Sequence, residues 1–343
     1  MTVQYPGKLT ARLAEIPYGK IMLATLSLFS MLLMLKNCDI AIEYMKNGLL
    51  LCARTVIPSL FPFMVISEII VSSGAGEYVG SLVAKPARWL FNISPSGACA
   101  VFLGAVCGFP VGARSAVQAL DNGFIDKTEC AHLLTFSNNP SSAFIISAVG
   151  ASLLGNRTLG LVLWLLTVIT SLICGFVMRL ILYRTSRAKP KVTTKAHTVS
   201  GVSTFTKALT SSTGAMLTVC AYVVFFSAFI GALGSALETV TPSPTVKALL
   251  FSFFELSSGA SLCSELEGGA SLPALAAALG WSGISVHCQI ITVCEGRGVS
   301  FRPYFFAKLL QALLSLVGML LLLHILPPEL TGGVESIFGS PLS

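Results

Sequence analysis

The sequence contains few charged residues. Of 343 residues, 54% are hydrophobic and only 11% are charged, whereas about 25% are charged in an ordinary soluble domain. Several apolar stretches approach the roughly 20 residues that an α-helix needs to cross the hydrocarbon core of a bilayer. This scarcity of charge excludes an ordinary soluble protein and predicts an all-α polytopic membrane protein. The lipid bilayer is therefore its first expected partner.

Residue patterns for several kinds of chemistry are missing as well. The ten cysteines occur singly, without a CxxC pair or a Cys/His spacing that would hold zinc. No phosphate-binding loop, HExxH motif or nucleophile–base pair is present. The net charge is +7, yet the cations occupy a few short loops and are not interleaved with aromatic residues. We therefore expect no enzyme, no cofactor, no metal site and no nucleic-acid partner.

Apolar stretches divide the chain into two halves joined by a basic segment. The stretches lie at about 20–35, 48–73, 97–120, 129–154, 158–183, 210–237, 246–264, 271–294 and 303–326. The positive-inside rule places the basic segment in the cytoplasm. The sequence thus predicts an N-terminal segment with a first transmembrane helix at 1–40, a first repeat at 41–183, a cytoplasmic linker at 184–207, a second repeat at 208–326 and a tail at 327–343.

The basic loops also indicate which stretches cross the membrane. If every stretch crossed, the linker would lie on the opposite side from the basic N-terminal segment. If 97–120 enters and returns on one side at its break "GFPVG", the linker returns to the cytoplasm. The same reasoning makes 246–264 a second re-entrant hairpin. Seven crossings and two hairpins, in the same order in each half, predict an inverted-topology repeat with broken transmembrane helices.

Four helix breaks are expected to meet at a binding site near the midplane. Backbone groups freed within hydrocarbon survive only when they are buried in protein or line a wet cavity. The first break contains Gly108, Pro110, Gly112 and Arg114. A helix that begins after Gly112, together with the guanidinium group of Arg114, favours an anion. The alternative is that Arg114 lies near the membrane surface or pairs with Asp121.

The second and fourth breaks, "FSNNPSS" and "WSGISVHCQ", carry amide and hydroxyl groups. Such groups replace lost backbone hydrogen bonds or bind a ligand, whereas a structural kink needs only the proline. His287 is expected either to relay a proton or to make a hydrogen bond between helices. The candidate substrate-binding residues of these two breaks are Asn138, Asn139, Ser141, Ser282 and Gln289.

The third break, "ELSSGAS", contains Glu255 directly after an apolar run. A carboxylate inside a membrane segment is costly and is a candidate for carrying a coupling proton or coordinating Na⁺. The alternative is a salt bridge from Glu255 to Arg114 across the two repeats. Ser258 and Gly259 are the neighbouring candidate substrate-binding residues.

The motifs "GFPVGAR", "TFSNNPSS", "FELSSGAS" and "GWSGISVHCQI" together resemble the YlbJ (SpoVV) family of sporulation integral membrane proteins, over about residues 40–326. The resemblance implies a nucleoside-recognition (Gate) protein, similar in architecture to concentrative nucleoside transporters. It implies residence in the cell membrane or outer forespore membrane of a spore-forming bacterium.

The resemblance also implies a function, namely transport of dipicolinic acid by alternating access. The partner would then be a small organic anion, and the chain could form a homo-oligomer. Two alternatives stay open: a transporter of nucleosides or other small solutes, and a non-transporting assembly protein of the spore envelope.

Overall fold

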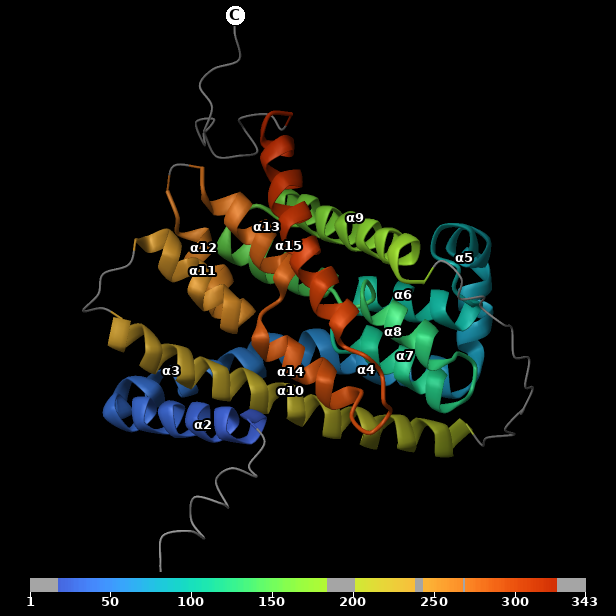
Figure 1. Ribbon diagram of the computed structural model, residues 1–343, viewed down its shortest axis with the longest axis horizontal. Helices are drawn as coiled ribbons and strands as arrows, with labels where there is room; N and C mark the ends of the chain where they lie inside the picture. The colour runs from blue at the N-terminus through green and yellow to red at the C-terminus, as the bar shows by residue number, and fades with distance from the viewer. Residues whose placement is uncertain (1–17, 184–200, 238–242, 268, 326–343) are drawn as a thin grey trace, which may run out of the picture.

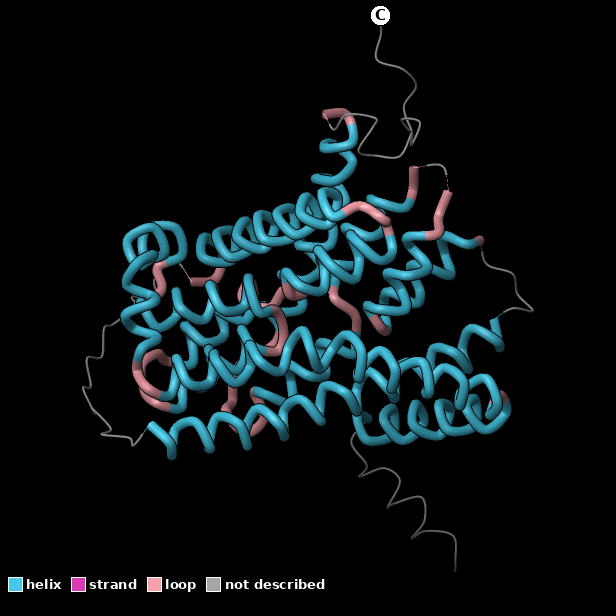
Figure 2. Tube along the Cα trace, turned by 180° about the vertical axis from the view of Figure 1, so that it is seen from behind, coloured by secondary structure: helices cyan, strands magenta, loops and turns pink. Residues whose placement is uncertain are grey.

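The computed structural model describes residues 18–183, 201–237, 243–267 and 269–325, which form helices joined by short loops (Figures 1 and 2). Within these ranges there is no β-strand. The first half contains α2 (Tyr18–Lys36), α3 (Cys38–Leu51), η1 (Cys52–Val56), α4 (Ile57–Ser72), α5 (Ala75–Phe91), α6 (Pro95–Cys107), α7 (Val111–Asp121), α8 (Lys127–Leu134), η2 (Phe144–Leu153) and α9 (Arg157–Ile181). The second half contains α10 (Gly201–Leu237), α11 (Pro244–Phe254), α12 (Leu256–Ser264), α13 (Ser271–Trp281), α14 (Ile284–Val293) and α15 (Arg302–Leu323). The segments η1 and η2 are π-helical.

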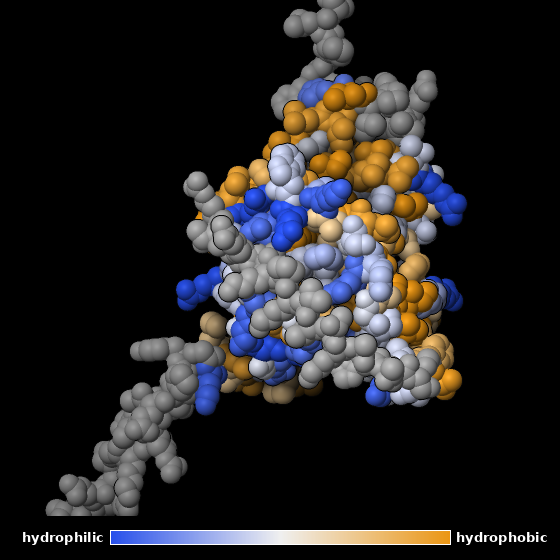
Figure 3. All heavy atoms as spheres, turned by 90° about the vertical axis from the view of Figure 1, so that its right-hand side faces the viewer, coloured by the Kyte–Doolittle hydropathy of each residue, from blue (hydrophilic) through white to orange (hydrophobic). Residues whose placement is uncertain are grey.

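The lengths of the helices confirm the predicted all-α polytopic class. Five helical stretches among the described residues are long and apolar enough to cross a bilayer: Cys38–Ser72, Arg157–Ile181, Val202–Leu237, Ser271–Val293 and Arg302–Leu323. A further pair, α5 and α6, passes the same test together but bends by 96° at its junction. In Figure 3, apolar side chains gather over the upper part and one edge of the face, as expected where a surface contacts lipid, whereas hydrophilic side chains occupy much of its centre.

Several details of the predicted topology lie beyond what this structure tests. Most of the predicted linker, the N-terminal segment up to residue 17 and the tail lie outside the described residues. Residues 201–207, the end of the predicted linker, form the first turns of α10. The predicted first transmembrane helix corresponds to α2, but the seven crossings, the repeat boundaries and the cytoplasmic side stay predictions.

Both predicted hairpins are present as pairs of packed helices. The first consists of α6 and α7, and the second of α11 and α12. The first reverses at Gly108, whose φ of +80° favours glycine, and the Phe109–Pro110 peptide bond that follows is cis. The second reverses at Glu255, where one residue of extended backbone separates the two helices. Both reversals fall within the stretches predicted as hairpins, while their re-entry from one side of the membrane stays a prediction.

Each hairpin packs closely against, and is hydrogen-bonded to, the segment around the break that follows it in the chain. A Cβ atom on Gly104 of α6 or on Gly112 of α7 would lie 1.8 or 1.9 Å from the carbonyl oxygen of Ser137 in the second break. The backbone N–H of Phe109 donates to the carbonyl oxygen of Asn139 at 2.8 Å. In the second half, the indole N–H of Trp281 donates to the carbonyl oxygen of Phe253 at 3.0 Å.

The two halves show the same order of elements and pack against each other reciprocally. Each half has a hairpin, a broken helix and a long helix, in that order. The second hairpin arm of each half, α7 or α12, contacts the helix that follows the break in the other half, α14 or η2. Likewise α8 contacts α15, and α13 contacts α9. Reciprocal contacts of this kind are those expected of two related repeats.

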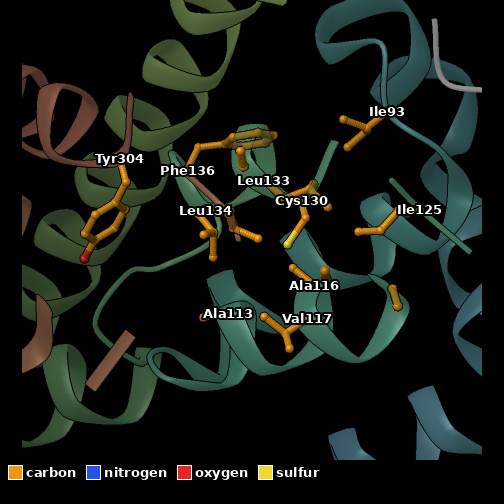
Figure 4. Close-up of a cluster of buried hydrophobic side chains, with 14 of the residues drawn as sticks. Ile93, Ala113, Ala116, Val117, Ile125, Cys130, Leu133, Leu134, Phe136 and Tyr304 are labelled. Atoms are coloured by element: carbon orange, nitrogen blue, oxygen red, sulfur yellow. The ribbon is translucent and has the colours of Figure 1, made fainter. Parts of the chain in front are cut away.

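The reciprocal contacts between the two halves produce two apolar cores. One core joins α6, α7 and α8 to Val286 and Ile290 of α14 and Tyr304 of α15. Part of this cluster is shown in Figure 4, where Ala113 and Ala116 of α7 lie next to Cys130 and other side chains of α8. The other core joins α12 and α13 to η2 and α9. Each of these two cores therefore contains side chains from both halves of the chain.

The contact between the first hairpin and the second break predicts a glycine requirement. We expect Gly104→Ala to lower stability by about 1–3 kcal/mol, because its new Cβ would overlap a main-chain oxygen in a packed interior. Thermal unfolding of the detergent-solubilised protein would measure the change. The matched control is Gly214→Ala in α10, because a Cβ on Gly214 meets nothing within 4 Å. Equal melting temperatures for both variants would contradict the close packing.

Candidate functional site

A cavity of about 50 Å³ lies where the four breaks converge. One water molecule needs roughly 10–15 Å³ by this measure, so the cavity has room for more than one. Its wall includes residues from each break and from η1, α4 and α10, which confirms the expectation that the breaks meet. The lining residues are Val56, Ser59, Leu60, Phe109, Ser141, Phe144, Val219, Val223, Glu255, Leu256, Ser257, Ser285, Val286 and Gln289.

The carboxylate of Glu255 is the charged group of the cavity wall. Its two oxygens accept hydrogen bonds from the backbone N–H groups of Ser257 at 2.8 Å and Ser258 at 2.7 Å. The side chain thus caps α12, where the positive end of the helix dipole favours a negative charge. No cation pairs with Glu255 among the described residues. Glu255 is 3% exposed, so its charge is balanced only by these N–H groups.

The first turn of α14 forms another part of the wall. No side chain caps this helix, and Ser285 and Val286 of its first turn line the cavity. An uncapped N-terminus presents backbone N–H groups and the positive end of a dipole. One turn further on, Gln289 is 3% exposed, and its side-chain oxygen has no hydrogen-bond partner. A buried amide oxygen without a partner indicates a ligand or water at this position.

Some of the predicted site residues line the cavity, and the others lie outside its wall. Ser141, Glu255 and Gln289 line it. Gly108, Pro110, Gly112, Arg114, Asn138, Asn139, Ser258, Gly259, Ser282 and His287 do not. Gly259 instead allows α12 to cross α11 closely, because a Cβ there would lie 2.3 Å from the Cα of Ser252. Ser282 ends α13 in a left-handed conformation.

The two asparagines of the second break belong to a buried polar network behind the cavity. The side-chain N–H₂ of Asn139 donates to Ser171 Oγ at 3.0 Å, and its Oδ1 accepts from Gln311 Nε2 at 2.8 Å. The Asn138 carbonyl oxygen accepts from Lys308 Nζ at 2.9 Å. Sequence reasoning missed both Lys308 and Gln311. The signal was a lysine and a glutamine three residues apart in an apolar stretch.

His287 connects two helices of the second half. Its Nδ1 lies 2.7 Å from the hydroxyl oxygen of Tyr304 on α15. The imidazole ring is 1% exposed and makes edge contacts with Trp281, Tyr304 and Phe305. Of the two roles expected for this histidine, the hydrogen bond between helices is the one present in this geometry.

Arg114 pairs with Glu68 of α4, and the expected alternatives of Glu255 and Asp121 are both wrong. Its Nη2 donates to Glu68 Oε2 at 2.7 Å and to Ser211 Oγ at 2.9 Å. The reason is geometric: α7 packs directly on α4, whereas Glu255 is held at the start of α12. Asp121 pairs instead with Arg297 at 2.8 Å. Sequence reasoning overlooked Glu68, the carboxylate within the apolar stretch 48–73.

The Arg114–Glu68 pair predicts a measurable coupling energy. Its side chains are only 15% and 18% exposed, so removing one partner leaves a largely desolvated charge. We expect Arg114→Gln and Glu68→Gln each to lower stability, and the double variant to lose about 1–3 kcal/mol less than the sum. Thermal unfolding of the four proteins gives the cycle.

The matched control for that cycle is the Arg297–Asp121 pair. Its side chains are 35% and 45% exposed, and a solvated ion pair contributes at most about 1 kcal/mol. A larger coupling energy for Arg297 and Asp121 than for Arg114 and Glu68 would contradict this ranking of the two pairs.

The fold and site together define a polytopic helical membrane protein with a largely apolar cavity at its converging helix breaks, into whose wall Glu255, Gln289 and several serines are set. The chain is 26% identical to the sporulation integral membrane protein YlbJ of Bacillus subtilis (strain 168) in an alignment 335 residues long. The alignment covers 88% of this chain and 82% of that protein. The resemblance to the YlbJ family is thereby confirmed. The membrane-length helices and the match to an integral membrane protein also confirm an integral membrane location. No protein-family model matches the chain. No solved structure matches it either.

Proposed function

We propose that this chain is a transporter in the membrane of a sporulating bacterium and moves a small organic anion by alternating access. The observation that carries the proposal is the cavity between the two halves, whose wall contains the start of α14, the Gln289 amide and Glu255. Solute sites of transporters with paired repeats lie at such junctions of broken helices. Similarity to YlbJ supports a role in sporulation. On this proposal the membrane is the cell membrane or the outer forespore membrane.

Both halves contribute residues to the cavity wall, as alternating access between two repeats requires. Ser141 and Phe109 come from the first half, whereas Glu255 and Gln289 come from the second. A movement of one half against the other would therefore open the cavity and separate its polar groups. A nucleoside-recognition (Gate) architecture, as in concentrative nucleoside transporters, is part of this proposal.

The charge of the cavity indicates what must accompany an anion. Glu255 is a buried carboxylate, and no lysine or arginine lines the cavity. An anion beside an ionised carboxylate in a low-dielectric site is strongly disfavoured. A proton or Na⁺ on Glu255 removes this repulsion and leaves the uncapped α14 N-terminus to attract the anion. Anion binding and cation binding are thereby linked at one residue.

Dipicolinate is the anion that we favour within this class. It is a flat ring with two carboxylates, and the cavity combines free helix N–H groups and hydroxyls with the aromatic rings of Phe109 and Phe144. Helix N-termini bind carboxylates, and aromatic faces stack on flat rings. The sporulation membrane protein YlbJ is the relative that favours this choice.

A second candidate is a transporter of nucleosides or another neutral polar solute. The lining favours it in one respect, since Glu255, Gln289 and several serines offer acceptors and hydroxyls without a cationic side chain. Such groups hydrogen-bond readily to sugar hydroxyls. Thermal shifts of the purified protein with dipicolinate, nucleosides and other carboxylates would separate the two candidates, because a ligand of the folded state raises its stability.

The proposed coupling predicts the effect of neutralising Glu255. We expect Glu255→Gln to lower gradient-driven uptake of dipicolinate into proteoliposomes about 10-fold or more. Coupling between two ligands typically changes affinity by roughly 5- to 150-fold, and this variant removes that coupling. Exchange of labelled for unlabelled solute should persist, since it needs no net cation movement. The control is Glu265→Gln, which changes an exposed glutamate at the other end of α12. Wild-type liposomes that transport no solute under any ion gradient would overturn the function.

The amide of Gln289 predicts a split between stability and binding. We expect Gln289→Leu to leave the melting temperature within about 2 °C, because the lost oxygen has no protein partner. The same change should raise the KM for the solute about 10-fold, the effect of one lost hydrogen bond to a charged group. An unchanged KM with a lower melting temperature would show that Gln289 serves the fold alone.

A further inference from the structure

Lys308 is a buried cation that the cavity does not use. It lies in the second turn of α15 and is 1% exposed. Its Nζ donates to the backbone oxygen of Asn138 and to Gln311 Oε1, each at 2.9 Å. No carboxylate forms a salt bridge with it among the described residues. A charge in a membrane interior is costly, so a lysine held by neutral oxygens alone needs an explanation.

The oxygens around Lys308 belong to a helix break. Helix α8 ends at Leu134, and the chain resumes a helix only beyond Ser141, so the carbonyl groups between are free of helix bonds. The C-terminal end of a helix carries a partial negative charge. In the same segment, Asn138 Oδ1 and Ser137 Oγ are buried without hydrogen-bond partners. Unwound carbonyls at helix C-termini are the groups that coordinate Na⁺ in transporters with broken helices.

A short chain of contacts joins this site to the cavity. Gln311 accepts from Lys308 and donates from Nε2 to Asn139 Oδ1 at 2.8 Å. The carbonyl oxygen of Asn139 accepts the backbone N–H of Phe109, which lines the cavity. The cation therefore sets the shape of the second break, and the second break holds the hairpin tip in the cavity wall.

The groups around Lys308 include no acid that would neutralise it. Cys174 of α9 and His287 of α14 are titratable groups within electrostatic reach of Lys308, and neither is a carboxylic acid. In α8, Glu129 accepts from the backbone of Ser94, and His132 bonds to the Gly175 carbonyl oxygen. Helix α13, which packs along α15, contains no titratable residue.

We propose that the Lys308 ammonium is a built-in cation that occupies a cation site at the second break. It takes the position that a free Na⁺ would need in order to balance the freed carbonyl groups. If the chain transports as proposed, the site then stays occupied throughout the cycle, and Glu255 is the remaining candidate for a coupled cation among the described residues. This inference concerns ion binding and stability, so it holds or fails independently of the solute that is transported.

Removal of the ammonium group should open the site to a free cation. Because Glu255 is a second candidate cation site, the test is made in the Glu255→Gln background. We expect Lys308→Ala in that background to melt at a lower temperature in choline chloride. Sodium chloride of equal concentration should raise its melting temperature by about 3 °C or more, as binding at roughly ten times Kd does. Glu255→Gln alone should show no sodium-specific rise.

Two further variants keep the test decisive. Lys308→Gln preserves more of the volume and should show the same sodium-specific rise. Lys247→Ala in α11, where the ammonium lies over the ring of Phe251 at 5.9 Å, should show none. The proposal is overturned if neither Lys308 variant responds to sodium, or if neither can be recovered folded in sodium. It is also overturned if Lys308→Met is as stable as the lysine form, since the charge is then dispensable.

Discussion

Backbone groups freed by a helix break must find partners inside the protein, and the arrangement of this molecule depends on that constraint. An unpaired N–H or C=O in an apolar interior costs several kcal/mol. Here each break is paired with another. The carbonyl oxygen of Ser137 lies between two glycines of the first hairpin, and the hairpin tip returns a hydrogen bond to Asn139. Because the breaks satisfy one another, they must meet, and the cavity forms where they do.

The same constraint explains the polar side chains around the cavity. Glu255 caps α12 with both carboxylate oxygens, and Lys308 donates to a carbonyl of the second break. Each charge therefore serves a helix end and is also available to a mobile ligand or a neighbouring group. By contrast, no side chain caps the start of α14 and the side-chain oxygen of Gln289 has no hydrogen-bond partner, and both belong to the cavity wall.

The sequence allowed the breaks to be predicted because their residues act locally. Gly108 requires a positive φ, and the asparagines and serines of the second break mark lost helix bonds. Ion pairing could not be predicted in the same way. Arg114 meets Glu68 from 46 residues away, and Lys308 meets Asn138 from 170 residues away. These pairings depend on which helices pack together. The sequence did show, as a signal, two charged residues inside apolar stretches, Glu68 and Lys308.

The first hairpin is anchored in a way that the second is not. Both salt bridges among the described residues involve α7: Arg114 ties its first turn to α4, and Asp121 ties its end to Arg297 beyond α14. The arms of the second hairpin make no ion pair within the described ranges. An opening of the cavity that keeps both pairs intact leaves α7 fixed to α4 and to Arg297, whereas α11 and α12 have no such tie to break. Two hairpins at the same place in the order of their halves would then differ in function: the first would form a fixed part of the cavity wall, and the second the part that moves.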